Sequence, residues 1–353
     1  MRMNQDQEYY SLLAEFTQLC ERLIDLGQPY LVVILCHELY RFLYPIEPYA
    51  QFSNDDPVTF IITHIRSLLE LAGRFPGPVT PYEFEFDKFS DDNERKPSTL
   101  PEQTAEVYSS LWKDFDTQTL TDESLQLLKG RLPQEFLAAN VAGNRILDMG
   151  CGSGRYSIAL ARAGAKEVVG IDLKRKSFAV AKAWCQQHRL AVTFSEANFH
   201  DLPFADGSFD FVFCNGTLHH SSSITRGLAE LARILKSSGK AFLYLYGAGG
   251  IFWTTRVALR KIFKRIPINY TKMVLRTIGM PANRFIFCDT WYVPLETHTT
   301  RAELEGSLTE NGFRFEKIVS GNAFDLDRAL DSGTPQGAEM WGEGEHRYIL
   351  EKV

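Results

Sequence analysis

The nine residues from Ile146 to Gly154 read Ile-Leu-Asp-Met-Gly-Cys-Gly-Ser-Gly, and they constrain the fold more than any other stretch. Two apolar residues that can end a buried strand precede Asp148, and glycines follow at alternate positions (Gly150, Gly152 and Gly154). Glycine at this spacing lets the backbone turn tightly and leaves bare main chain beside a ligand. An amphipathic helix is predicted to begin directly afterwards, with free N–H groups at its start. The segment therefore predicts a strand, a glycine turn and a helix that hold a nucleotide-like ligand.

The type of ligand follows from the glycine spacing and from one charge. A dinucleotide loop has the pattern G-x-G-x-x-G and seats a pyrophosphate at the helix N-terminus. Here the pattern is G-x-G-x-G, and Arg155 directly follows the last glycine. The carboxylate of Asp148 is expected close to the ligand, where it would repel a pyrophosphate and attract the ammonium and sulfonium groups of S-adenosylmethionine. The stretch resembles the first motif of class I S-adenosylmethionine-dependent methyltransferases.

The resemblance covers roughly residues 105–353 and implies the fold of that family. Strands are predicted at 145–149, 167–172, 191–197, 208–214, 240–246, 313–319 and 346–352. Helices are predicted between them at 154–163, 175–188, 224–235 and 300–311. Such alternation indicates a parallel sheet with helices on both faces. The last two strands have no predicted helix between them, so the final strand can run antiparallel. We therefore expect a doubly wound, seven-stranded, mostly parallel α/β sheet of the Rossmann-like methyltransferase type.

A helical accessory domain is predicted for residues 1–75. Apolar residues recur there at three- and four-residue steps, which is typical of helices that pack on one another. Residues 76–103 are rich in proline and acidic residues and are interpreted as a linker. The methyltransferase domain then takes up residues 104–353, with an insertion at residues 250–295.

The ends of the predicted strands carry the candidate cofactor-binding residues, because ligands of open α/β sheets lie beyond the carboxyl ends of the strands. Asp172 ends the second strand, where the resemblance implies an acid that accepts both ribose hydroxyl hydrogens; capping the next helix is the alternative. In the resembled family an acid commonly contacts the adenine amino group at the position of Asn198, and Phe199 is expected on the adenine face. The residues predicted to bind S-adenosylmethionine are Asp148, Gly150, Cys151, Gly152, Gly154, Asp172, Leu173, Asn198, Phe199 and Asn215.

His219 and His220 follow the fourth strand and are the candidate catalytic residues. Imidazole has a pKa near neutrality, so either ring can accept a proton from an attacking hydroxyl or amine. The alternatives are a structural or capping role, or metal binding. No third ligand at helical or hairpin spacing accompanies the pair, so no metal is predicted. A thioether or carboxylate acceptor needs no base, and the two histidines therefore do not identify the methylated atom.

The insertion contains a basic segment that we expect to form a lid over the acceptor site. From Ile251 to Cys288 there are eight Lys or Arg residues and no Asp or Glu. Three roles stay open for residues 256–276: a solvated amphipathic helix, a reader of an anionic acceptor such as a carboxylate, phosphate or acidic carrier protein, or a contact with RNA or an anionic membrane. The residues predicted to line the acceptor cavity, with core packing as the alternative for the aromatic ones, are Tyr108, Trp112, Tyr246, Arg256, Trp291 and Tyr292.

Composition narrows the class of protein. The net charge of −6 argues against a general nucleic-acid binder, and the six cysteines show no metal-ligand spacing. The longest strongly apolar stretch, residues 30–36, is too short to cross a bilayer, so a cytoplasmic location is predicted. The leading interpretation is a methyltransferase that acts on a small molecule, anionic ones included. The alternatives are a methyltransferase that acts on RNA, a protein or a carrier-bound substrate, and a non-catalytic partner subunit that only binds the cofactor.

Overall fold

A computed structural model of the chain describes residues 2–43, 57–74, 99–112, 117–174, 178–280, 284–319 and 335–353. The chain forms two compact units, each assembled from separate stretches of sequence. Unit 1 consists of Met1–Lys96, Gly249–Val293 and Ser332–Gly342. Unit 2 consists of Pro97–Ala248, Pro294–Asp331 and Glu343–Val353.

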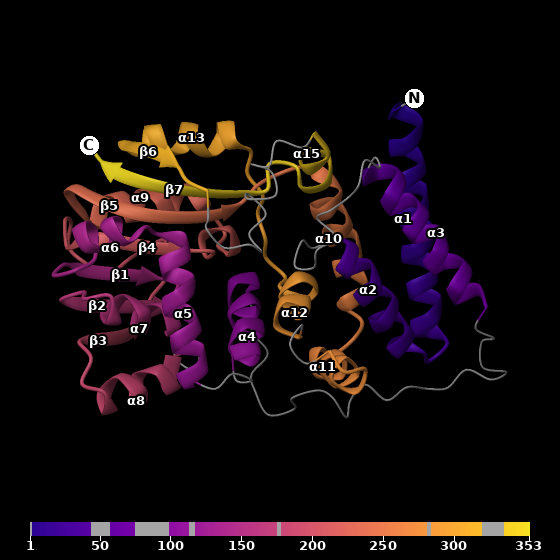
Figure 1. Cartoon of the computed structure of the whole chain (residues 1–353), viewed down its shortest axis with the longest axis horizontal. Coiled ribbons are helices and arrows are strands. Elements are labelled where there is room, and N and C mark those ends of the chain that lie inside the picture. The colour runs from indigo at the N-terminus through magenta and orange to yellow at the C-terminus, as the bar shows by residue number, and fades with distance from the viewer. Residues whose placement is uncertain are drawn as a thin grey trace. The chain divides into compact units, whose positions relative to one another are not determined.

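Unit 2 is built on a single sheet, in which the described residues form seven strands in the order β3-β2-β1-β4-β5-β7-β6 (Figure 1). The strands are β1 (Arg145–Met149), β2 (Glu167–Asp172), β3 (Val192–Glu196), β4 (Phe209–Asn215), β5 (Leu235–Tyr246), β6 (Phe313–Lys317) and β7 (Glu345–Lys352). The first five strands pair in parallel, and β7 runs antiparallel to both β5 and β6. The predicted fold class is therefore confirmed. The expected direct link between the last two strands was wrong, because α15 (Pro335–Trp341) lies between them in the chain and belongs to unit 1.

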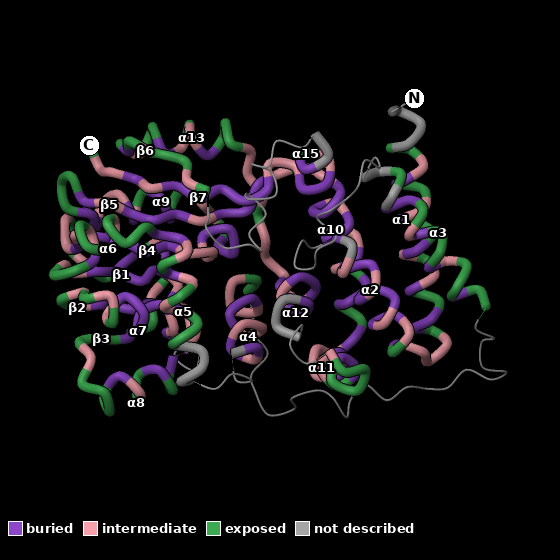
Figure 2. Tube along the Cα trace, viewed as in Figure 1, coloured by how far each residue is buried: buried purple, intermediate pink, exposed green. Residues whose placement is uncertain are grey.

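Helices cover both faces of this sheet. Side chains alternate along each strand, so each strand presents apolar side chains to the helices on either face. Ile146 packs in the cluster that includes residues of α5 (Thr117–Arg131), α6 (Gln134–Asn140) and α7 (Arg155–Arg162). Leu147 and Met149 instead pack on the other face, with residues of α9 (Ile224–Ile234) and α13 (Arg301–Glu310). Figure 2 shows the central strands buried along most of their length. Because β1 is covered on both faces, the sheet is buried as parallel sheets require.

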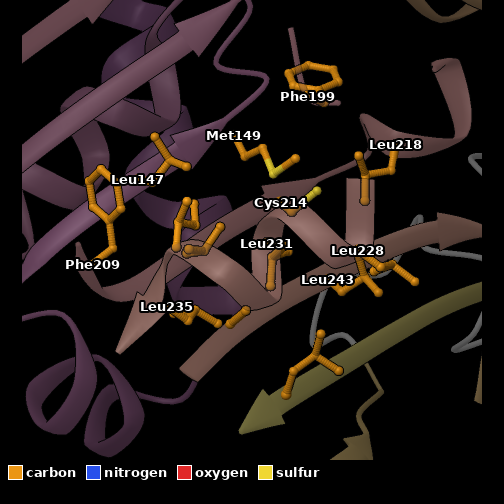
Figure 3. Close-up of a cluster of buried hydrophobic side chains, with 14 of the residues drawn as sticks. Leu147, Met149, Phe199, Phe209, Cys214, Leu218, Leu228, Leu231, Leu235 and Leu243 are labelled. Atoms are coloured by element: carbon orange, nitrogen blue, oxygen red, sulfur yellow. The ribbon is translucent and has the colours of Figure 1, made fainter. Parts of the chain in front are cut away.

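One apolar cluster supports the carboxyl ends of β1 and β4 (Figure 3). Met149 from β1 and Cys214 from β4 lie close to Phe199 and Leu218, and all four side chains are buried. Leu231 on α9 lies beneath them and joins the cluster to the helix layer. The loops that follow β1, β3 and β4 are thereby fixed on a packed base.

Unit 1 is a helical assembly in which the N-terminal helices share a core with the insertion. Its helices are α1 (Arg2–Asp25), α2 (Pro29–Leu43), α3 (Pro57–Gly73), α10 (Gly250–Phe263), α11 (Ile268–Thr277), α12 (Arg284–Tyr292) and α15. The Tyr9 hydroxyl is 2.6 Å from Thr255 Oγ1, and Trp341 Nε1 donates to the Leu43 carbonyl at 3.0 Å. No helix among the described residues is both long and apolar enough to cross a bilayer.

The insertion therefore differs from the sequence expectation in its packing partner. The sequence places residues 250–295 in the methyltransferase domain, whereas in the structure residues 249–293 form one unit with the N-terminal helices. The apolar face of α10 carries Phe252, Leu259 and Phe263, which are fully buried or nearly so. Burial of this face holds the insertion in unit 1, while its cations Lys261 and Lys264 lie exposed.

Replacement of Gly154 by Ala should destabilise unit 2 by about 2–4 kcal/mol, because it combines backbone strain with a clash. Gly154 has a φ of +79°, and an added Cβ would lie 2.5 Å from the Ala181 Cβ and 2.9 Å from the Phe194 ring. Gly143→Ala is the matched control, since Gly143 has a φ of +74° and no atom within 4 Å of the added Cβ. The control should lose only about 1 kcal/mol in chemical denaturation. Equal losses for the two variants would contradict the packing role.

Candidate functional site

A cavity of about 680 Å³, including space open to solvent, lies in unit 2 at the carboxyl ends of β1, β2 and β4. This is the edge at which the ligands of doubly wound sheets bind. Its walls come from the glycine turn, the start of α7, the ends of β2 and β4, and one face of α4 (Leu100–Trp112). A residue that contacts a ligand bound here must line this cavity.

The glycine turn forms one wall, through Gly150, Cys151 and Gly152. Gly150 has a φ of +87°, and an added Cβ would lie 2.0 Å from Thr217 Cγ2, so this position accepts no side chain. Thr217 Oγ1 donates to the Met149 carbonyl at 2.8 Å and ties the end of β4 to the turn. Gly154 does not line the cavity, because it packs behind the turn against Phe194.

Asp172 lines the cavity next to the turn, together with Leu173. Its Oδ2 accepts the Gly152 N–H at 2.9 Å, which orients the carboxylate, and its Oδ1 accepts the Lys174 N–H at 3.4 Å. Burial raises the pKa of Asp172, while the backbone N–H donors oppose that rise. The capping alternative does not apply, because the N-cap of α8 (Ala179–Gln187) is Phe178.

Asp148 does not line the cavity, so the expectation that its carboxylate lies close to the ligand was wrong. The alternation of β1 turns its side chain towards α7, where it is 2% exposed and accepts the Ser157 hydroxyl at 2.6 Å. Burial, together with the negative charge of Asp172, raises the pKa of Asp148 to about 7. Of these two carboxyl groups, only that of Asp172 lines the cavity.

The loop after β3 contributes Phe199 and not Asn198. Phe199 is 6% exposed and lines the cavity. Asn198 is exposed, and its Oδ1 accepts the His200 N–H at 3.0 Å, which closes a local turn of the kind that Asn favours. The expectation that Asn198 contacts a ligand therefore has no support in its position, since it is absent from the cavity wall.

Asn215 at the end of β4 lines the cavity with a buried acceptor atom. Among the described residues, its Oδ1 has no hydrogen-bond partner. A buried oxygen without a donor is destabilising, and a ligand N–H or O–H would relieve this. The atom therefore marks a place where a ligand donor group fits.

His220 reaches the cavity and forms a hydrogen-bonded pair with Tyr108 of α4, which also lines it. The His220 Nδ1 is 2.8 Å from the Leu295 carbonyl, and its Nε2 is 2.8 Å from the Tyr108 hydroxyl. A carbonyl only accepts, so Nδ1 carries the proton and donates. In the neutral ring Nε2 is then the acceptor, and Tyr108 donates to it. The pair presents an imidazole with its basic nitrogen turned towards α4.

His219 does not line the cavity, although it was predicted alongside His220. Its ring is fully buried and stacks on Tyr246 at 3.7 Å between ring centroids. The ring of His220 meets it edge-on at 4.2 Å. His219 and Tyr246 therefore form the packed layer behind His220.

Of the other residues predicted for the acceptor, three lie in unit 1 and none of these three lines the cavity. Arg256 is 2% exposed, with its guanidinium 3.9 Å from Asp289 Oδ2. Trp291 stacks on Phe263, and the Tyr292 hydroxyl is 2.5 Å from Thr271 Oγ1. The side chain of Trp112 lies outside the described residues.

Several wall residues were missed by sequence reasoning. Thr104 and Ala105 come from α4, and nothing in a helical pattern shows which face of a helix meets a cavity. Arg155 and Tyr156 come from the start of α7, and the guanidinium of Arg155 lies 4.8 Å from the Tyr156 ring. The position of Arg155 directly after the glycine motif was a usable signal.

The sequence of this region matches known proteins. Residues 147–243 match the sequence family described as a methyltransferase domain. The chain is 38% identical over 114 residues to the ubiquinone biosynthesis O-methyltransferase of Xanthomonas oryzae pv. oryzae, covering 32% of this chain and 47% of that protein. It is 32% identical over 142 residues to the 27-O-demethylrifamycin SV methyltransferase of Amycolatopsis mediterranei, covering 39% and 50%. Residues 147–243 form a methyltransferase domain.

The matched segment runs from β1 to β5 and so contains the glycine turn, Asp172, Asn215 and His220 of the methyltransferase domain. The chain spans half or less of the length of these two relatives. An S-adenosylmethionine-dependent methyltransferase from Mesorhizobium loti is a structural neighbour, with a TM-score of 0.40 at 19% identity, covering 62% of this chain and 98% of that one. In the described part of the chain, no group of three or more His, Cys, Asp or Glu side chains is placed to hold a metal ion.

Asp148→Asn should remove a pH dependence of folding from the methyltransferase domain. The folded state keeps the Asp148 proton up to about pH 7, whereas an unfolded chain releases it near the ordinary pKa of 3.8. The folded state thus binds more protons in that window, and Asp148 makes stability fall with rising pH, by up to about 1.4 kcal/mol per pH unit. Urea denaturation from pH 4 to pH 8 should show a flatter profile for the variant.

Asp210→Asn is the control for this measurement. The Lys236 ammonium and the Arg145 N–H hold the pKa of Asp210 below its usual range. Its contribution is therefore lost only as the pH falls below about 4, and the slope between pH 4 and pH 7 should match that of the unsubstituted protein. A slope that Asp148→Asn leaves unchanged would contradict the buried, protonated carboxyl.

Proposed function

We propose that this protein is a methyltransferase that binds S-adenosylmethionine in the cavity of unit 2 and methylates a hydroxyl group of a small-molecule acceptor. The observation that carries the proposal is the His220–Tyr108 pair on the cavity wall, with the basic nitrogen of His220 2.8 Å from the Tyr108 hydroxyl. A base is needed only where the acceptor atom begins with a proton. The presence of such a pair therefore favours a hydroxyl over a thioether or a carboxylate.

The cavity residues fit the groups of the cofactor. Asp172 offers a carboxylate to the ribose hydroxyls, and the neighbouring Leu173 and Phe199 offer apolar surface to the adenine. The unpartnered Oδ1 of Asn215 suits the ammonium group. Arg155, at the start of α7, suits the carboxylate at the same end of the cofactor. When bound, the cofactor supplies a methyl group that its sulfonium has already activated for in-line transfer.

The protein then has to orient the acceptor and accept its proton. The acceptor hydroxyl donates its proton to the Tyr108 oxygen as the Tyr108 proton passes to His220 Nε2. His220 becomes an imidazolium whose Nδ1–H still donates to the Leu295 carbonyl, which stabilises the new charge. The relay returns the Tyr108 hydroxyl unchanged and leaves one proton on His220. The name of the Xanthomonas relative, an O-methyltransferase of ubiquinone biosynthesis, supports oxygen as the methylated atom.

A macromolecular or anionic acceptor is the second candidate, favoured by the exposed cations of the basic segment. Lys261 on α10, Lys264 directly after that helix and Arg276 on α11 are exposed. Exposed cations bind RNA, acidic proteins or other anionic partners through a term that weakens steeply with salt. Acceptor binding that is insensitive to salt would favour the small, neutral acceptor.

Asp172→Ala should weaken binding of S-adenosylhomocysteine at least about tenfold in calorimetry, because two hydrogen bonds to a charged group are lost. Asp206→Ala is the matched control. Asp206 is an exposed aspartate whose contact is the surface pair with Arg233, 2.9 Å away, and it does not line the cavity. The control should bind the ligand as the unsubstituted protein does. An unsubstituted protein that shows no heat of binding would overturn the cofactor assignment.

His220→Ala should lower methyl transfer by about 10²–10⁴-fold, the range of a lost general base, while cofactor affinity changes little. The assay follows label from S-adenosylmethionine into a panel of phenols and aliphatic alcohols. His219→Phe is the matched control, because a phenyl ring preserves the stack on Tyr246. Full turnover by His220→Ala would contradict the role of His220 as the base. It would not contradict the proposed cofactor site.

A further inference from the structure

The segment from Pro294 to Thr300 runs along the carboxyl edge of the sheet, directly behind the proposed base. The chain enters unit 2 at Pro294, after Val293 ends a stretch of unit 1. The Thr297 N–H donates to the His219 carbonyl at 2.8 Å, and the Thr299 N–H donates to the Tyr246 carbonyl at 3.2 Å. Main-chain bonds therefore hold the segment against the end of β5 and the 3-10 turn η4 (Leu218–His220).

Leu295, the second residue of this segment, uses both of its main-chain polar groups on the wall of the cavity. Its carbonyl accepts the His220 Nδ1–H at 2.8 Å. Its N–H donates to Thr104 Oγ1 at 3.3 Å. Thr104 is 4% exposed and precedes Tyr108 by four residues on α4, so the two side chains lie on one face of that helix.

These contacts close a ring of four residues. Tyr108 donates to His220, His220 donates to Leu295, Leu295 donates to Thr104, and one turn of α4 joins Thr104 to Tyr108. The Leu295 carbonyl can only accept and the Leu295 N–H can only donate, so these two groups set the direction of the bonds in the ring. The ring can close in this sense only while Nδ1 carries the His220 proton.

We propose that Thr104 is a positioning residue of the acid–base pair: through the main chain of Leu295, its hydroxyl keeps the His220 proton on Nδ1, so that Nε2 can accept a proton. This inference rests on the proposed role of His220. Without the Thr104 oxygen, the Leu295 N–H has no acceptor in the ring, and the main chain between Pro294 and the bond of Thr297 to His219 can shift. The Leu295 carbonyl then leaves Nδ1, and the ring nitrogen that faces Tyr108 can carry the proton instead. An Nε2–H cannot accept a proton from Tyr108.

The surroundings of His220 make this bond the one that selects the tautomer. The rings that face it are Tyr108 from α4, His219 from η4 and Tyr246 from β5, whose centroid is 5.7 Å away. A tyrosine hydroxyl both donates and accepts, so Tyr108 alone is compatible with either tautomer. The Leu295 carbonyl only accepts, and its position therefore decides which nitrogen carries the proton.

The test is ¹⁵N NMR of the histidine rings in Thr104→Val and Thr104→Ser. The unsubstituted protein should show His220 protonated on Nδ1 alone. Thr104→Val keeps the shape and removes the acceptor, and it should show a mixture of the two tautomers together with a three- to tenfold fall in turnover. Thr104→Ser restores the oxygen and should return both readouts to normal. Thr271→Val, which removes a buried hydroxyl in unit 1, is the control and should change neither.

Several outcomes would overturn the proposal. His220 protonated on Nε2 in the unsubstituted protein would refute it directly. A Thr104→Val protein with the native tautomer would refute it as well, provided that calorimetry shows normal binding of S-adenosylhomocysteine. If Thr104→Val does not fold, the Thr104→Ser variant decides: loss of the native tautomer in that variant would contradict the proposal. Full turnover by His220→Ala refutes the proposed base, and the ring spectra then still report whether Thr104 sets the tautomer.

Discussion

The close approach of Gly150 and Thr217 is the contact on which the rest of the cavity depends. No side chain fits between them, because a Cβ on Gly150 would lie 2.0 Å from Thr217 Cγ2. This approach, closed by the bond from Thr217 to Met149, joins the ends of β1 and β4. It places Asn215 and His220 on the same cavity as Asp172, whose orientation comes from the turn itself through the Gly152 N–H.

Most of unit 2 could be predicted from the sequence, because each of its strands and helices is indicated by a pattern within its own residues. The strand β1 and the helix α7 flank a glycine motif, and period-two and period-3.6 patterns mark their neighbours. The two errors of fold concern partners that are distant in the chain. The helix α15 packs with α10, where Trp253 Nε1 donates to the Trp341 carbonyl at 3.2 Å. The insertion likewise buries its apolar face in unit 1, and no local pattern names the partner of such a face.

Site residues were predictable where the course of the main chain determines whether they line the cavity. They were not predictable where a side chain can bind more than one partner. Asp172 and the glycines follow from the position of a strand end. Asp148 and Asn198 are polar residues at equally suitable positions, yet each is held by a neighbour: Ser157 binds one, and the His200 N–H binds the other. His219 and His220 are adjacent and chemically identical, and only packing on Tyr246 separates the buried ring from the one that lines the cavity.

The backbone of Leu295 shows the limit of such reasoning most clearly. Both of its contacts with the site use main-chain atoms, so any side chain except proline's would supply the same donor and acceptor at position 295. No sequence pattern can therefore identify Leu295. Its two partners, Thr104 and His220, do use side-chain atoms, but their connection becomes visible only when the position of the Leu295 main chain is known. The main chain at Leu295 thus contributes to the proposed acid–base pair as much as the histidine ring does. The proposed base therefore depends on the Leu295 carbonyl that accepts its Nδ1–H as well as on its own ring.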